Sequence, residues 1–267
     1  AAEPAVHRPL RLSERDAAAF GSDVSFVGAG YRNRRDALRR FLDMDFRLWG
    51  SDWEGASEFD GVLQRNGMRV STDDSVRIWN ASKVNLNLHS STYCDGVEPR
   101  GDFVNPRTFE IAASGAFQIV DRRSLLEGAF DVGAELVAVD SVSEMREATR
   151  MYLDAPEERA RIVEAGRARV LREHTYEHRM RSLVAQVVAR HPARFSRGDR
   201  NWTVGDAKKE ASGSIAAYLG QFDDARPFTL AEMVRPIPDA EGPLSEPEAL
   251  FLFLQQFDDL YLSEYRR

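Results

Sequence analysis

The sequence predicts an α/β domain in which a parallel sheet is covered by helices on both faces, followed by a helical extension. Short apolar segments of strand length alternate with amphipathic, helix-length segments from Asp23 to about Arg190. Glycines or helix-capping residues mark most boundaries between them, and the chain has no convincing internal repeat. Such alternation is typical of parallel strands joined by crossover helices. We therefore predict a Rossmann-like domain over residues 23–190.

The strands are predicted from short apolar runs that end at glycines or polar residues. The predicted strands are residues 24–27, 46–49, 68–70, 84–88, 116–120 and 135–139. The run Val84-Asn85-Leu86-Asn87-Leu88 alternates apolar and polar residues, which is the period of a β-strand.

The helices are predicted from caps and from apolar residues at helical spacing. Arg34–Leu42 places apolar side chains on one face, and Ser71 or Thr72 caps a helix that ends near Ser82. Asn105 and Pro106 begin the next helix as N-cap and first residue, and Gly115 ends it. Three further helices are predicted to begin at Ser143, Pro156 and Thr175, the last ending near Arg190.

The two ends of the chain differ in character from this domain. Residues 1–22 are interpreted as a leading linker, and residues 191–267 as an extension. Within the extension, residues 192–214 resemble a linker, prolines interrupt the next stretch, and one apolar helix is predicted at 248–261. Its aromatic surface must be buried somewhere, so we expect self-association or docking through 248–261.

Composition excludes several classes of protein. The net charge of −7 argues against a dedicated nucleic-acid-binding protein. The single cysteine, Cys94, excludes an internal disulfide and a cysteine-rich zinc site, and it fits a cytoplasmic protein. No apolar run is long enough to span a membrane. The chain does not begin with methionine, and we expect it to be a piece of something longer.

Ligands of open parallel sheets bind at the carboxyl ends of the strands. The candidate loops are therefore residues 28–35, 89–106, 121–125 and 140–143. In the first, Gly28 and Gly30 would allow close approach of a ligand, and Arg34 and Arg35 could bind a diphosphate. A tight turn before a solvated basic helix is the simpler alternative. An NAD-dependent oxidoreductase is disfavoured, because the dinucleotide motif requires glycine where Asn33 stands.

The second loop contains His89, which ends a predicted strand. His89 could contact a sugar hydroxyl or a phosphate, or act as a base, or it could merely cap the strand end. Cys94 has no histidine pattern that would make it a nucleophile, and we interpret it as structural.

Asp102 and Glu110 flank the start of the helix that Asn105 caps. Carboxylates there can accept hydrogen bonds from a ribose or sugar. The charge of Arg107 in the first turn opposes the helix dipole, which favours a functional role over a stabilising one. The alternative is an Arg107–Glu110 surface pair of little energetic value.

This segment resembles the donor-binding segment of GT-B glycosyltransferases, in which two acidic residues seven residues apart precede an alanine-rich helix that ends at glycine. The closer resemblance is to the CgeB-like (spore-maturation) glycosyltransferases. It covers about residues 23–190 and rests on residues 24–28 with 34–35, 83–87, 105–110 with 113–115, and 175–179.

The resemblance implies the C-terminal half of a GT-B fold and a nucleotide-diphosphate-sugar donor, with no metal and no other cofactor. It implies that Glu110 binds the ribose and Asp102 faces the transferred sugar. The predicted catalytic residues are Asp102 and His89, and the predicted substrate-binding residues are Gly28, Gly30, Arg34, Arg35, Arg107, Glu110, Gly115, Ala116 and Phe117.

The leading hypothesis is thus a glycosyltransferase donor domain that transfers a sugar to an unknown acceptor. A GT-B enzyme has two Rossmann-like domains, and the 22 residues before the predicted domain cannot form the acceptor-binding one. The alternative is a non-catalytic nucleotide-sugar binding module of a larger assembly.

Overall fold

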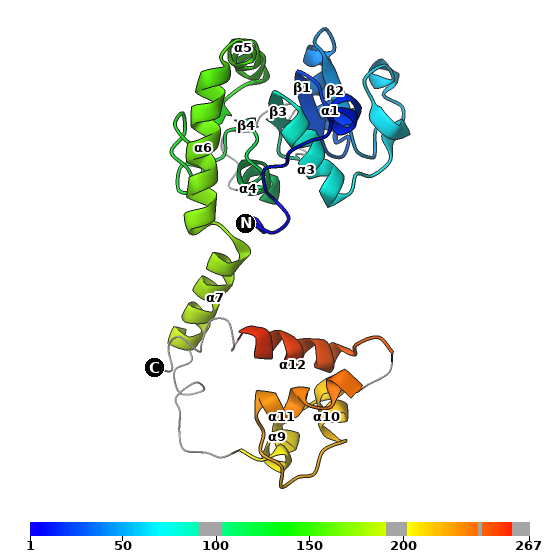
Figure 1. Cartoon of the computed structure of the whole chain (residues 1–267), viewed down its shortest axis with the longest axis vertical. Helices are drawn as coiled ribbons and strands as arrows, with labels where there is room; N and C mark the ends of the chain where they lie inside the picture. The colour runs from blue at the N-terminus through cyan, green and yellow to red at the C-terminus, as the bar shows by residue number, and fades with distance from the viewer. Residues whose placement is uncertain (91–102, 191–201, 240–241, 258–267) are drawn as a thin grey trace. The chain divides into compact units, whose positions relative to one another are not determined.

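A computed structural model of the chain describes residues 1–90, 103–190, 202–239 and 242–257 (Figure 1). The chain divides into two compact units, residues 1–190 and 191–267.

The first unit contains a five-stranded sheet with the strand order β2-β1-β3-β4-β5. The strands are β1 (Val24–Val27), β2 (Phe46–Trp49), β3 (Val84–Asn87), β4 (Gln118–Asp121) and β5 (Val137–Val139). Every neighbouring pair is parallel. The predicted fold class, a Rossmann-like α/β domain, is confirmed.

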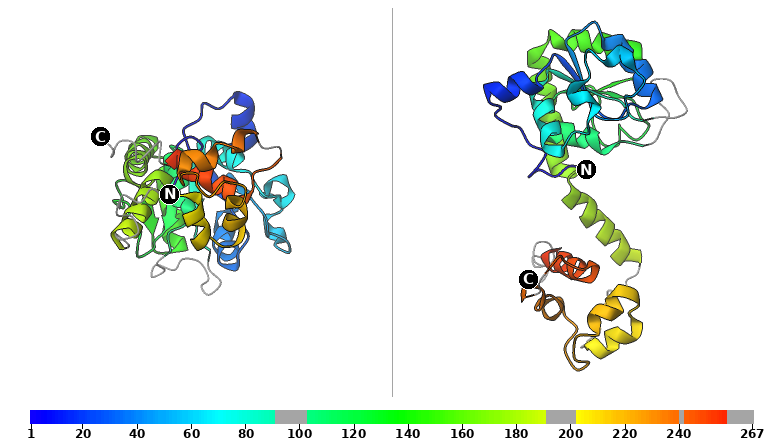
Figure 2. Two further views of the ribbon diagram at one scale, coloured as in Figure 1. Left: turned by 90° about the horizontal axis from the view of Figure 1, so that it is seen from below. Right: turned by 90° about the vertical axis from the view of Figure 1, so that its right-hand side faces the viewer.

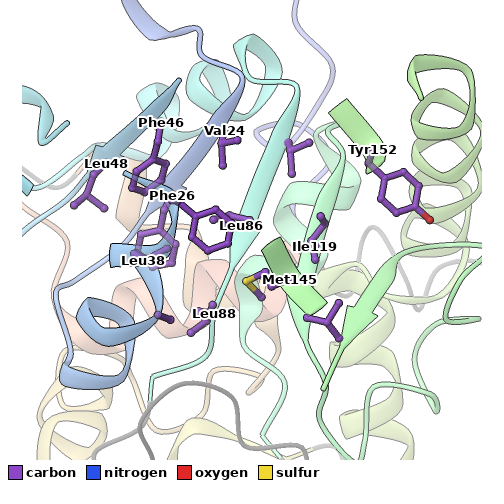
Figure 3. Packing of buried hydrophobic residues seen from close by; sticks show 14 of the residues in the cluster. Val24, Phe26, Leu38, Phe46, Leu48, Leu86, Leu88, Ile119, Met145 and Tyr152 are labelled. Carbon is purple, nitrogen blue, oxygen red and sulfur yellow. The ribbon is translucent and has the colours of Figure 1, made fainter. Parts of the chain in front are cut away.

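Helices cover both faces of this sheet (Figures 1 and 2). The helices of the first unit are α1 (Glu14–Phe20), α2 (Arg32–Leu38), α3 (Thr72–Ala81), α4 (Pro106–Ala113), α5 (Val142–Leu153), α6 (Pro156–Glu173) and α7 (Tyr176–Arg190), with short 3-10 helices η1 (Arg39–Phe41), η2 (Ser57–Phe59) and η3 (Gln64–Gly67). Helix α7 buries no residue and extends away from the sheet (Figure 1). On one face, Leu38 of α2 and Met145 of α5 pack against Leu86 and other strand residues (Figure 3). On the other face, α3 and α4 pack against Val27, Trp49 and Val120.

Two sequence predictions about these elements are wrong. Residues 68–70 follow η3 and form no strand, and the Met68 side chain is 62% exposed. A short apolar run becomes a strand only when a neighbouring edge pairs with it, and here the bridge to β2 is made by Leu63 instead. The cap of α5 is Ser141 rather than Ser143, because the Ser141 side chain accepts the backbone N–H of Glu144.

Residues 1–22 pack along the first unit. The backbone of Ala2 donates to His174 and accepts from Tyr176, and Phe20 belongs to the core beneath α3. Helix α1 begins at the Ser13 cap. The leading segment therefore contributes structure to the domain, including one residue of the site described below.

The second unit contains helices α9 (Val204–Glu210), α10 (Gly213–Leu219), α11 (Leu230–Val234), the 3-10 helix η4 (Ile237–Asp239) and α12 (Glu246–Phe257). Helix α9 lies inside the predicted linker 192–214, where Thr203 and Asp206 form a capping box. Phe251 of α12 is buried and stacks on Tyr218 at 5.5 Å between ring centroids, whereas Leu250 and Phe253 are exposed. Part of the apolar surface of α12 is thus buried inside its own unit. In the portions of the chain that the structure describes, no helix has the length and hydrophobicity to cross a membrane.

Candidate functional site

A cavity of about 650 Å³ opens at the carboxyl edge of the sheet. Its walls come from the loops after β1 and β2, from the beginnings of α3 and α4, and from His7 and Tyr176. Of the predicted site residues, the structure brings Gly28, Arg107 and Glu110 together around this space.

A buried polar network fixes the beginning of α4 beside the cavity. Asn87 of β3 donates to Thr108 Oγ1 (3.0 Å) and accepts from the Asn105 side chain (3.1 Å). Gln118 of β4 donates to the Thr108 carbonyl at 2.7 Å. Asn105 caps the helix through the Thr108 N–H. Asn87, a polar residue of the alternating strand β3, therefore positions α4 on the sheet rather than facing solvent.

Arg107 projects from this fixed helix start into the cavity wall. Its Nη1 donates to the Val27 carbonyl, and its guanidinium lies 5.9 Å from the Trp79 ring centroid. Its Nε is buried without a hydrogen-bond partner among the described residues. Burial lowers the pKa of Arg107, while the negative charge of Glu110 raises it. The result is a half-buried cation with one donor still unsatisfied.

Glu110 lies one turn further along α4 and lines the same cavity. In the described part of the chain its carboxylate has no hydrogen bond and no ion pair, so the surface pair with Arg107 does not form. A half-buried carboxylate and a guanidinium facing one cavity can bind a ligand that carries both hydroxyl groups and anionic groups.

The loops after β1 and β2 pack backbone against backbone. Gly28 N–H donates to Trp49, Gly30 N–H donates to Ser51, and Trp53 Nε1 donates to Gly28. A Cβ on Gly30 would lie 2.2 Å from the Asp52 carbonyl oxygen. Gly30 therefore serves loop packing and does not line the cavity, contrary to the sequence prediction.

Arg34 and Arg35, which are predicted to bind a diphosphate, lie outside the cavity lining. Arg34 is 8% exposed and donates to the carbonyls of Leu88 and Ala29, and Arg35 donates to those of Gly30, Glu54 and Asp52. Desolvation, followed by the charge of Arg107, lowers the pKa of Arg34 to about 10. Both guanidinium groups join loops together, and neither lines the cavity.

His89, a predicted catalytic residue, does not line the cavity either. Its side chain is 1% exposed, its Nδ1 lies 2.7 Å from Asp121 Oδ1, and its Nε2 accepts the Asn105 N–H at 2.9 Å. Both ring nitrogens are therefore used inside the protein, and His89 connects the end of β3 to β4 and α4. Burial alone would raise the pKa of Asp121, but the hydrogen bonds from His89 and the charge of Arg123 hold it below its ordinary value.

Gly115, Ala116 and Phe117 lie at the opposite edge of the sheet from the cavity. Helix α4 begins at the carboxyl edge and ends at the amino edge, where these residues lead into β4. Gly115 N–H donates to Ala112 within the helix end, and the Phe117 ring packs on Tyr152 in the core. None of the three lines the cavity, although a contact with the donor is predicted for them.

Two predicted residues, Cys94 and Asp102, lie outside the described residues. Within the described ranges, no group of three or more histidine, cysteine or acidic side chains is arranged to hold a metal ion.

The structure adds cavity residues that the sequence reasoning did not find. The lining includes His7, Tyr31, Ser51, Asp52, Arg69, Thr72, Ser75, Trp79 and Tyr176. Thr72 and Ser75 lie at the start of a helix that the sequence predicts. A helix that leads into the next parallel strand begins at the carboxyl edge of the sheet, so these two residues could have been predicted to lie there. Asp52 carries no such signal, because its left-handed backbone (φ 64°) is set by the loop packing.

Residues 32–185 match a protein-family model described as glycosyl transferase-like. A search of curated proteins finds no sequence match. Among solved structures, a sucrose-phosphate synthase from Thermosynechococcus elongatus is similar with a TM-score of 0.52 and 17% identity, over 70% of this chain and 51% of that one. A glycosyltransferase from Rickettsia africae ESF-5 has a TM-score of 0.53 and 9% identity, over 70% and 55% of the two chains. The chain thus spans about half the length of each.

Proposed function

The chain belongs to the glycosyl transferase-like family and has the fold of GT-B glycosyltransferases, and we propose that its first unit binds the nucleotide-diphosphate-sugar donor of a sugar transfer to an acceptor. Within that family we propose the CgeB-like group, on the sequence resemblance alone. The donor would occupy the cavity at the carboxyl edge of the sheet. Its volume of about 650 Å³ lies in the range of small-molecule sites.

The observation that carries this proposal is the state of Arg107. Its guanidinium lines the cavity and forms no ion pair within the described residues. A half-buried cation without a counter-charge is costly to the folded protein, and a phosphate in the cavity would supply that charge. Val27 and Trp79 hold the group in place before a ligand arrives, so little side-chain freedom is lost on binding. An anionic diphosphate is the part of the donor that fits this group.

Glu110 would bind the ribose of the same nucleotide. It follows Arg107 by one helical turn, a rise of about 4.5 Å at 1.5 Å per residue, which suits a sugar attached directly to the phosphate. Its carboxylate oxygens have no other partner among the described residues, and both can accept from a pair of vicinal hydroxyls.

During transfer the leaving diphosphate gains negative charge. A fixed cation beside it stabilises that charge in the transition state, and we propose this role for Arg107. Following the resemblance, we propose that Asp102 faces the transferred sugar.

The test of the donor site combines a variant with a modified ligand. Calorimetry on the full chain should show at least ten-fold weaker binding of a nucleoside diphosphate to Glu110→Ala, because two hydrogen bonds to a charged group are lost. The 2′-deoxy nucleotide should bind the native chain more weakly than the ribonucleotide, and Glu110→Ala should remove that difference. Glu164→Ala, on the exposed side of α6, is the control. Unchanged affinity in Glu110→Ala would refute this site.

A non-catalytic binding module is the second candidate, because the chain spans only 51% and 55% of the two similar structures. The two functions differ in turnover. Incubation with a panel of nucleotide sugars should release free diphosphate slowly if the chain is an enzyme, and Asp102→Asn should slow that release without weakening binding. Tight binding with no release under any condition would favour the module.

A further inference from the structure

Two segments that are distant in the sequence form one wall of the cavity. Residues 50–52 follow β2, and residues 67–70 lead into α3. The segments lie side by side, since a Cβ on Gly67 would be 3.7 Å from the Gly50 carbonyl oxygen. Asp52 lines the cavity from the first segment and Arg69 from the second.

Asp52 is held in place by its own loop. Its backbone is left-handed (φ 64°), its carbonyl accepts from Arg35, and Ser51 Oγ donates to its Oδ2 at 2.9 Å. A non-glycine residue in this region is uncommon, although aspartate tolerates it better than most. Strain of this kind persists where the surroundings impose it, often at binding sites.

The charges of Asp52 and Arg69 are not neutralised within the described part of the chain. Asp52 has no cationic partner there, Arg69 has no ion pair or hydrogen bond, and the two are not paired with each other. The wall therefore presents a double hydrogen-bond acceptor and a double donor to the same cavity.

This combination complements one nucleobase edge better than the others. Guanine presents two adjacent N–H donors, N1–H and the 2-amino group, next to an O6 acceptor that arginine binds well. A carboxylate can accept both donors at once. In uracil and thymine the single N3–H lies between two carbonyl oxygens, and the carboxylate would repel both of these oxygens. Adenine and cytosine each offer one amino group next to a ring-nitrogen acceptor.

We propose that the nucleotide bound in this cavity is a guanine nucleotide, with Asp52 accepting from N1–H and the 2-amino group and Arg69 donating to O6. The inference rests on the proposed function, because it names the base of the nucleotide held by Arg107 and Glu110. The donor class is then a guanosine-diphosphate sugar.

The experiment measures binding of GDP, IDP, XDP, UDP and ADP to the full chain by calorimetry. GDP should bind the native chain at least ten-fold more tightly than UDP or ADP, and IDP, which lacks the 2-amino group, should bind with intermediate affinity. Asp52→Asn should reverse the preference between GDP and XDP. Xanthine carries a carbonyl at position 2, which can accept a hydrogen bond from the new amide N–H. The 2-amino group of guanine is a donor and would face that N–H without forming a bond.

Glu54→Gln is the matched control, because it removes a nearby exposed negative charge that does not line the cavity. It should leave the order of the five affinities unchanged. UDP binding as tightly as GDP, or no change in the GDP/XDP ratio in Asp52→Asn, would overturn the guanine assignment. If Glu110→Ala still weakens nucleotide binding at least ten-fold in that case, the donor site stands and only the base is wrong. If none of the five nucleotides binds, both proposals fall.

Discussion

Arg107 occupies the first turn of α4, where its positive charge opposes the helix dipole. It is kept there by the Val27 carbonyl and the Trp79 ring rather than by a carboxylate. A cavity-lining cation that weakens its own helix and has no ion pair within the described residues is better explained by ligand binding than by stability. Arg34 and Arg35, the other two arginines predicted to bind phosphate, donate hydrogen bonds to backbone carbonyls of neighbouring loops.

His89, Asp121 and Arg123 form a buried charged cluster behind the cavity. Asp121 accepts from the His89 backbone N–H at 2.7 Å and pairs with Arg123 at 2.8 Å. The folded state lowers the pKa of Asp121. Its contribution to stability is therefore present above the unfolded pKa of about 3.9 and is lost as the pH falls through the lower folded value.

Asp121→Asn should destabilise the first unit at pH 7 by about 3–5 kcal/mol, because the change removes the carboxylate from a buried ion pair with Arg123. The variant should also lose less stability than the native chain when the pH falls from 5 to 3. Urea unfolding followed by tryptophan fluorescence measures both effects, and Asp140→Asn, an exposed member of a surface ion pair, is the control. An equal acid sensitivity in the two chains would contradict this role for Asp121.

At the scale of elements, the site depends on how the loops after β1 and β2 approach each other. Gly50 has φ 121°, and a Cβ there would lie 2.4 Å from the Gly28 carbonyl oxygen. The contact sets the position of Gly28 and Asp52 on the cavity wall. Close backbone approach therefore requires glycine at position 50, as it does at position 30.

Gly50→Ala should lower both the stability of the first unit and its affinity for nucleotide. Gly55→Ala distinguishes backbone strain from the steric clash of a Cβ, since Gly55 also has a positive φ (74°) but open space where the Cβ would lie. We expect Gly55→Ala to cost about 1–2 kcal/mol from backbone strain alone and to leave affinity unchanged. Thermal unfolding and calorimetry distinguish the two variants, and equal losses of affinity would refute the packing argument.

The elements differ in how far the sequence predicts them. Helix α4 has a complete local signal, with Asn105 as cap, Pro106 as first residue and Gly115 (φ 67°) beyond its end. Residues 68–70 have an apolar, strand-like composition but find no partner edge. Caps act within a few residues, whereas strand formation depends on a neighbour elsewhere in the chain.

At the scale of the whole molecule, each unit has its own apolar core. Phe251, Tyr218 and Phe222 belong to the core of the second unit. The apolar core of the first unit lies between the sheet and its helices. The donor site proposed above uses residues of the first unit alone. A change in one core should then leave the other intact.

Phe251→Ala should destabilise the second unit by about 3–5 kcal/mol, since it removes a buried aromatic side chain. Nucleotide affinity should be unchanged. Hydrogen exchange measured by mass spectrometry would show faster exchange in α10 and α12 and unaltered exchange in β1, β3 and α4. A loss of nucleotide affinity in Phe251→Ala would show that the units are coupled. Leu250→Ala, at an exposed position on α12, is the control.

The alternation of strands and helices, the capped start of α4, and the spacing of Arg107 and Glu110 by one turn can all be predicted from the sequence. These features depend on residue type and short spacing, which act locally. The folded structure was needed to show that Arg34, Arg35 and His89 hold loops together, that Gly115–Phe117 lie at the far edge of the sheet, and that Asp52 and Arg69 share a wall. Those outcomes depend on which carbonyls, charges and glycines meet after folding, and their partners lie far apart in the sequence.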